Sequence, residues 1–141
     1  MQQPLISRTL LVTSGPFGEL ANTAVAEAIG RGLTSGGWPQ LDLCPIDDAH
    51  NALDDLDPRL RQARAVIVAF ARLHEDTLAG TPAFEIATRA RQTGVPAYAI
   101  THDSTLGTFA ARMLDLQVVV EAASPTARAL TAAAKRLAAL V

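Results

Sequence analysis

One stretch of the sequence places an arginine and a polar turn directly after its most apolar segment, residues 65–70. Arg72 supplies a guanidinium, whose fixed fork of N–H donors suits carboxylates and phosphates. Thr77 and Gly80 follow, and Thr81-Pro82 is typical of a helix start with proline at the first helical position. We therefore take Arg72, Thr77, Gly80 and Thr81 as candidate ligand-binding residues.

A second turn, Ser14-Gly15-Pro16-Phe17-Gly18, follows a short apolar run at residues 9–13. Ser14, Gly15 and Gly18 are candidates for an anion-binding turn ahead of a helix N-terminus. The alternative is that both glycines simply serve a strand-to-helix turn, and a lone glycine-rich turn does not separate the two. Pro16 has no N–H to offer a phosphate, and the sequence contains no GxxxxGK[ST] motif.

A third polar group, His102-Asp103-Ser104, follows an apolar segment at residues 95–101. Adjacent residues rarely form a catalytic triad, because the three side chains must converge in space. No GxSxG motif is present, so hydrolysis is not favoured. We expect Asp103 or Ser104 to cap a short helix, and we keep His102 and Asp103 as candidate ligand-binding residues.

Metal binding and thiol chemistry are not predicted. His50, His74 and His102 lack the spacing of a metal-binding histidine pair. Cys44 is the single cysteine, which excludes an intrachain disulfide, and its place at the end of an apolar segment predicts a small buried hydrophobe. We assign no catalytic residue and no metal ligand.

Apolar runs and helical spacing alternate along the chain. Strands are predicted at residues 9–13, 41–44, 65–70, 95–101 and 117–120, and helices at residues 19–35, from about 57, 82–94, from 103 or 104 to about 114, and after the cap Ser124-Pro125. Such alternation predicts one α/β domain over residues 1–141, a three-layer α/β/α sandwich around a parallel sheet. In the common flavodoxin-like strand order 2-1-3-4-5, the first and third strands lie side by side and ligands bind at their carboxyl ends.

Composition narrows the choice of partners and compartment. The chain has 141 residues, of which 49% are apolar and 18% charged, and its formal net charge is -2. This near-neutral balance argues against nucleic acid as a main partner. No apolar run approaches the length of a membrane span and no signal peptide is recognisable, so we expect a cytoplasmic protein that does not bind membranes.

Two stretches resemble type-1 glycerate kinases. The family's GEGRLDxQTLxGKxPxGVA signature is matched at Arg72-Leu73, Thr77-Leu78, Gly80 and Pro82. The family's GVPVIALAG segment, which follows the helix, is similar to the segment that begins at Gly94-Val95-Pro96. Gly18, Leu20 and residues 26–33 resemble the helix after the family's first strand. The resemblance extends over nearly the whole chain in element order and is specific at about ten positions.

The departures from the family pattern fall on charged positions. The family's loop-1 aspartate and lysine correspond to Ser14 and Phe17, its motif glutamate and aspartate to Phe70 and His74, and the lysine after the glycine to Thr81. About twenty residues, 45–64, stand where the family has a second domain. The resemblance therefore implies the sheet domain of a glycerate kinase without its partner domain and with few of its charges.

Two functions follow from this resemblance. The first is a degenerate, non-catalytic relative that binds a small anion or a partner at the crevice between the first and third strands. It would need no cofactor, and it could act as a monomer or as a homo-oligomer. The alternative is a reduced ATP-dependent kinase of glycerate or a related hydroxy acid, which would require ATP and Mg²⁺. The loss of charges favours the first function.

Overall fold

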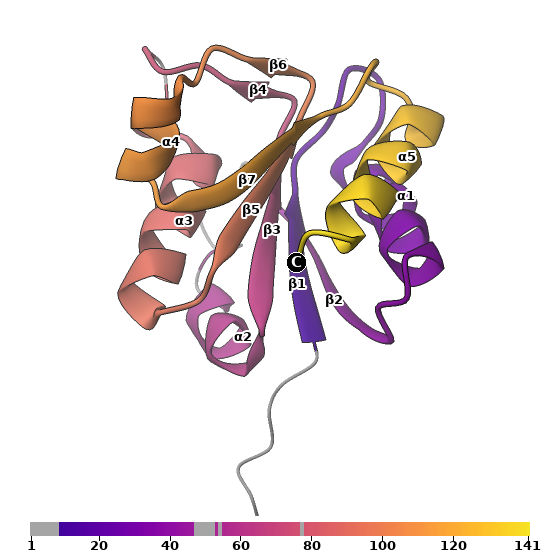
Figure 1. The fold of residues 1–141 in the computed structure, drawn as a ribbon, viewed down its shortest axis with the longest axis horizontal. Helices are drawn as coiled ribbons and strands as arrows, with labels where there is room; N and C mark the ends of the chain where they lie inside the picture. The colour runs from indigo at the N-terminus through magenta and orange to yellow at the C-terminus, as the bar shows by residue number, and fades with distance from the viewer. Residues whose placement is uncertain (1–8, 47–52, 54, 77) are drawn as a thin grey trace, which may run out of the picture.

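A parallel five-stranded sheet forms the centre of the molecule (Figure 1), in a computed structural model that describes residues 9–46, 53, 55–76 and 78–141. The sheet order is β2-β1-β3-β5-β7, and every neighbouring pair is parallel. Its strands are β1 (Thr9–Ser14), β2 (Gln40–Pro45), β3 (Ala65–Ala69), β5 (Ala97–Thr101) and β7 (Leu116–Glu121). Counted along this sheet alone, the order is 2-1-3-4-5, so the predicted topology is confirmed.

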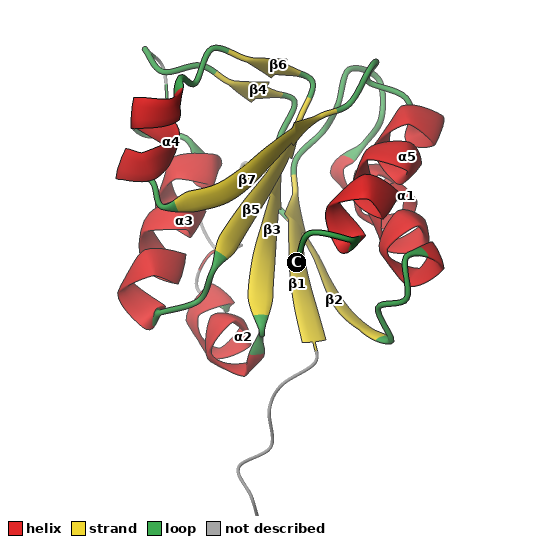
Figure 2. Cartoon of the chain, viewed as in Figure 1, coloured by secondary structure: helices red, strands yellow, loops and turns green. Residues whose placement is uncertain are grey.

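Helices cover both faces of this sheet, which gives the predicted three layers (Figure 2). One face carries α1 (Asn22–Ser35) and α5 (Ala127–Ala138), and the other carries α2 (Leu56–Gln62), α3 (Pro82–Thr93) and α4 (Thr108–Met113). The buried apolar residues separate accordingly into two clusters, one on each side of the sheet. Along β1 the neighbours Leu10 and Leu11 belong to opposite clusters, as the alternation of strand side chains requires.

The two helices of the first face approach each other closely at Gly32. A Cβ atom at this position would lie 2.3 Å from the Thr131 carbonyl oxygen and 2.7 Å from the Ala134 Cβ. Thr131 also donates its hydroxyl to the Ala28 carbonyl of α1 at 2.8 Å. Small residues on both helices thus allow their backbones to meet, and a large side chain at residue 32 would separate them.

A second, two-stranded parallel sheet extends beyond the carboxyl ends of β3 and β5. Its strands are β4 (Arg72–Leu73) and β6 (Asp103–Ser104), paired Arg72 to Asp103 and Leu73 to Ser104. We call this β4–β6 unit the ribbon. It replaces the helix cap that the sequence predicted at Asp103 or Ser104, because both residues are extended and pair with Arg72 and Leu73, several residues before α4 begins. The helix α4 begins instead at Thr108, after an N-cap at Gly107.

Helix boundaries agree with the sequence prediction at α3 and differ from it elsewhere. Thr81 caps α3, its Oγ1 accepting the Phe84 N–H, and Gly94 ends the helix at a φ of 78°. At α5 the cap is Thr126 rather than Ser124, because the Thr126 hydroxyl accepts the Ala129 N–H. The helix α2 begins at Leu56, one residue before the predicted start, and buries Leu56 completely. Within the described residues, no helix has the length and apolar character needed to cross a bilayer.

Candidate functional site

The predicted crevice lies where β1 and β3 end side by side, with Ser14 paired to Ala69. Ser14 is fully buried and donates its hydroxyl to the Asn22 carbonyl at 2.9 Å, at the start of α1. The Gly15 N–H donates to the Ala69 carbonyl, and the Phe17 N–H to that of Leu20. Both residues therefore use their N–H groups within the protein rather than present them to a ligand.

Aromatic rings occupy the neighbourhood of this loop. A Cβ on Gly15 would lie 2.7 Å from Cδ1 of Phe70, so the ring packs directly on the glycine backbone. Phe17 is completely buried in the cluster beneath α1 and α5. Gly18 has a φ of 56°, which favours glycine, and lies against Pro125. Where the family resemblance has a lysine and a glutamate, this chain thus places apolar rings at the end of the first and third strands.

The turn before α3 is held by its own hydrogen bonds. Thr81 Oγ1 donates to the Leu78 carbonyl at 2.6 Å and accepts the Phe84 N–H at 3.3 Å. Gly80 has a φ of 89°, a conformation that only glycine adopts without strain. The Thr81 hydroxyl thus serves the helix start. The candidate Thr77 lies outside the described residues, as does His50.

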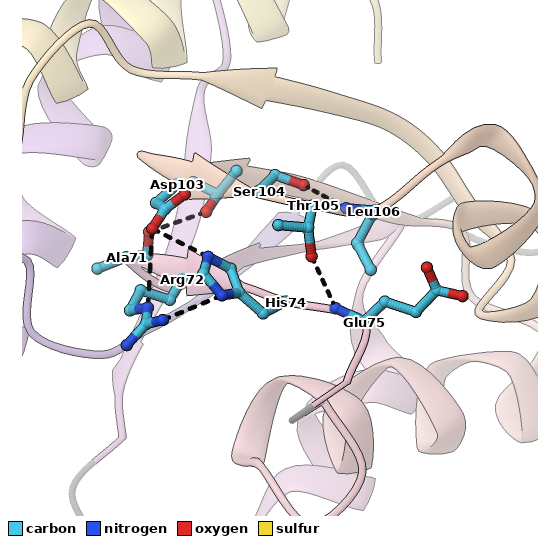
Figure 3. A network of polar contacts seen from close by, with 9 residues as sticks. Ala71, Arg72, His74, Glu75, Asp103, Ser104, Thr105 and Leu106 are labelled. Atoms are coloured by element: carbon cyan, nitrogen blue, oxygen red, sulfur yellow. Dashed lines mark hydrogen bonds and ion pairs between the residues drawn. The ribbon is translucent and has the colours of Figure 1, made fainter.

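Arg72, His74 and Asp103 form a closed group of polar contacts on the ribbon (Figure 3). Arg72 Nη2 lies 3.0 Å from His74 Nδ1, His74 Nε2 lies 2.9 Å from Asp103 Oδ2, and Arg72 Nε lies 3.8 Å from the same oxygen. The Arg72 side chain is 68% exposed, whereas that of His74 is 16% exposed. We call these three residues the ribbon cluster. Its imidazole is packed into the protein and its guanidinium reaches solvent.

The contacts define which nitrogen of His74 carries the proton. A guanidinium only donates, so Nδ1 accepts from Arg72 and the hydrogen of a neutral imidazole then sits on Nε2. Nε2 is buried and meets Asp103 at ion-pair distance but without hydrogen-bond geometry. The imidazole thus holds the Arg72 guanidinium through Nδ1 and lies beside the Asp103 carboxylate without a hydrogen bond to it.

His102 lies at the base of the ribbon rather than in the cluster. Its ring Nδ1 lies 3.2 Å from the Ala122 carbonyl, and its backbone N–H donates to the Ala71 carbonyl at 3.1 Å. The Ala71 oxygen also accepts the Asp103 N–H and the Thr101 hydroxyl, which anchors the ribbon to the main sheet. The structure thus brings Arg72 and Asp103 together, and His102 precedes Asp103 along the chain.

The partners of Arg72 are not its nearest acidic neighbours in the sequence. Glu75 and Asp76 follow it closely, yet the guanidinium contacts His74 and Asp103. Glu75 instead donates its N–H to the Thr105 hydroxyl across the ribbon at 3.0 Å. The spacing of Arg72 and His74, two apart in an extended segment, was the available signal, because such residues share one face of a strand.

Metal and thiol chemistry find no support within the described part of the chain, which contains no group of three His, Cys, Asp or Glu residues arranged to hold a metal ion. Asp47 and Asp48 lie outside it. Cys44 is buried, as predicted. Burial raises the pKa of its thiol above the ordinary value, with Asp42 adding to the rise and Arg59 opposing it. A thiol with a raised pKa is a poor nucleophile at neutral pH.

No protein-family model matches this sequence, and no curated protein does. Among solved structures, the chain is similar to a protein from Burkholderia pseudomallei named as pilus assembly-related, with a TM-score of 0.51 and 17% identity. That match covers 98% of this chain and 96% of the other. At so low an identity, the similarity shows a shared fold and nothing about activity.

A weaker similarity is to a structure named as glycerate kinase 2 from Salmonella typhimurium. The TM-score is 0.48 and the identity 18%, over 71% of this chain and 28% of the kinase. This chain therefore matches less than a third of the kinase. At this TM-score and identity, the likeness carries no conclusion about family or activity.

Proposed function

We propose that this protein is a non-catalytic relative of the glycerate kinase sheet domain, and that it binds a small carboxylate or phosphate anion beside Arg72. The observation that carries the proposal is an exposed guanidinium fixed at the carboxyl edge of the sheet. His74 holds one of its nitrogens at 3.0 Å, and the side chain is still 68% exposed. In open α/β sheets this edge is where ligands bind.

The restraint on Arg72 matters because a flexible arginine loses conformational entropy when it binds. Here His74 supplies part of that ordering in advance, which favours bidentate contact with a planar anion. The contact with Asp103 is 3.8 Å long, beyond hydrogen-bond distance, so an anion does not have to displace a short ion pair.

The surroundings favour binding over phosphoryl transfer. Transfer needs several positive charges and usually Mg²⁺ around the reacting phosphoryl group. The loop after β1 uses the N–H groups of Gly15 and Phe17 internally, and the Phe70 ring packs over Gly15. An ATP-dependent kinase of glycerate is the competing function, and a separate assay on the same preparations tests it.

The test is calorimetric titration with phosphate and with glycerate at low salt, on the wild type and two arginine variants. We expect Arg72→Ala to weaken binding at least tenfold. Arg61→Ala should bind like the wild type, because Arg61 is an exposed arginine in the last turn of α2, on another part of the molecule. Failure of both anions to bind the wild type, or equal binding by both variants, would refute the proposal.

The kinase alternative is measured in the same preparations as ADP release with glycerate, ATP and Mg²⁺. We expect no glycerate-dependent ADP release above the rate without glycerate. Glycerate-dependent turnover that Arg72→Ala abolishes would replace the binding function with catalysis.

A further inference from the structure

The edge strand β2 presents backbone groups that have no partner within the described residues. β2 lies at one edge of the sheet, beside α1 (Figure 1), and the Ile46 N–H donates to the Ser14 carbonyl at 2.8 Å. Hydrogen-bonding direction alternates along a strand, so Asp42 and Cys44 face β1. The N–H and C=O groups of the alternate residues, Leu41 and Leu43, consequently point away from the sheet and are free to pair with another strand.

A groove runs between this edge and α1. Its volume is about 600 Å³, and Leu41 and Leu43 contribute half-buried apolar side chains to it. Gly30 of α1 also lines it, and a Cβ there would lie 3.6 Å from a methyl carbon of each leucine. The groove is therefore apolar at its centre, and Gly30 is adjacent to both leucines.

Two opposite charges border the groove. Glu27 and Arg31 lie one helical turn apart on α1, and both are exposed. Neither forms an ion pair with another described residue. When two copies of the same helix lie antiparallel, an acidic and a basic group at this spacing can form two ion pairs between the copies.

We propose that this surface is the interface of a homodimer in which two β2 strands pair antiparallel about a two-fold axis. Placing Leu41 opposite Leu43 of the partner subunit lets their backbone groups exchange hydrogen bonds. Because Gly30 lies against both leucines, the same axis passes beside Gly30. It then brings Glu27 against Arg31 of the partner subunit, and Arg31 against Glu27 of the partner subunit.

The self-complementary charges are the reason that a second copy is the occupant. Backbone pairing alone would accept any extended segment, whereas the order Glu27–Gly30–Arg31 across the groove matches its own two-fold image. The other edge strand, β7, is a poorer surface, because its pairing with β5 contains a register shift.

The arrangement also places the two Asp42 side chains near each other on the opposite face of the sheet. Each already has an ion-pair partner in Arg59 of its own chain, at 3.3 Å. The two pairs give alternating charges across the axis, which limits the repulsion between the carboxylates.

The test is sedimentation equilibrium of the wild type, Glu27→Arg, Arg31→Glu and a matched control, Arg128→Glu, which reverses an exposed charge on α5. The wild type and the control should dimerise. Each groove variant should dimerise at least about tenfold more weakly than the wild type, because like charges then face each other twice. Circular dichroism confirms that each variant is folded.

Mixing the two groove variants provides the decisive readout. In a heterodimer of Glu27→Arg with Arg31→Glu, every facing pair is again of opposite charge, so association should recover to near the wild-type strength. In the wild-type dimer the amides of Leu41 and Leu43 should exchange with solvent slowly, and in either variant alone they should exchange fast. A wild type that is monomeric at millimolar concentration, or a dimer that neither charge reversal weakens, would overturn the proposal.

Discussion

At the scale of single residues, the chemistry of this protein depends on which polar side chains retain capacity for a ligand. Ser14 donates its hydroxyl to the Asn22 carbonyl at the start of α1, and Thr81 donates its hydroxyl to the Leu78 carbonyl in the turn before α3. Of the charged candidates, Arg72 is the more exposed, at 68% against 53% for Asp103, and His74 holds one of its nitrogens at 3.0 Å. The hydroxyls of the two turns are thus structural, and the exposed charges belong to the ribbon.

Cys44 illustrates how burial sets reactivity at a single residue. Its raised pKa means that the folded state binds the thiol proton more tightly than the unfolded state does. The stabilisation is full below the ordinary thiol pKa and is lost as the pH rises through the raised value. We predict that urea unfolding will show a smaller loss of stability between pH 7 and about pH 10 in Cys44→Ala than in the wild type.

Thiol labelling in native buffer gives an independent check on the same residue. Native protein at about pH 8 should react with a thiol reagent far more slowly than urea-unfolded protein, because the thiol is both buried and protonated. Equal labelling rates in the two states would show that Cys44 is accessible and contradict its buried position.

At the scale of elements, small residues determine how helices pack on the sheet. Gly30 and Gly32 both lie inside α1, where alanine is intrinsically favoured by up to about 1 kcal/mol. Their surroundings differ: a Cβ at residue 30 meets methyl carbons at 3.6 Å, whereas one at residue 32 meets a backbone oxygen of α5 at 2.3 Å. At residue 30 both helix preference and packing therefore accept alanine. At residue 32 helix preference favours alanine but packing against α5 opposes it.

We predict opposite signs for two alanine substitutions in this helix. Gly32→Ala should lower the free energy of unfolding by about 1–3 kcal/mol, because the α5 backbone must move. Gly30→Ala should raise it by about 0.5–1 kcal/mol through helix preference alone. Denaturant unfolding measures both, repeated at a tenfold lower protein concentration to separate folding from association. A stabilising Gly32→Ala would contradict the close approach of α1 and α5.

At the scale of the whole molecule, the centre of the main sheet should be more stable against local unfolding than the ribbon. β1 and β3 lie inside the sheet, and Leu11 and Ile67 on them are fully inaccessible to solvent. The ribbon has only two short strands, and its outer residues are exposed. A two-stranded unit of this size is only marginally stable by itself.

We therefore predict a gradient of amide hydrogen exchange. The amides of Leu11 and Ile67 should exchange only through global unfolding, and those of Leu73 in the ribbon and Thr105 directly after it through local opening at lower free energy. Hydrogen exchange followed by NMR gives both values in one experiment. Ribbon amides as strongly protected as those of β3 would show that the ribbon unfolds only with the core.

The sequence by itself determined the order and type of the main elements and the parallel sheet they build. Apolar periodicity and helix-start residues such as Thr81 act over a few neighbouring positions, so they are visible without coordinates. The caps expected at Ser124 and at Asp103 or Ser104 were wrong, because Thr126 caps α5 and because Asp103 and Ser104 pair with β4 as a short strand. Local polar residues indicate that a boundary is near but do not fix its position.

Only the tertiary structure decided which side chains surround Arg72 and what fills the crevice. The contact of Arg72 with Asp103 depends on the register of two strands far apart in the sequence, and no local pattern encodes that register. The packing of Phe70 on Gly15 likewise depends on adjacent parallel strands ending at the same height. Periodicity is a local property of the chain, whereas register and ring packing arise when distant segments compete for the same space.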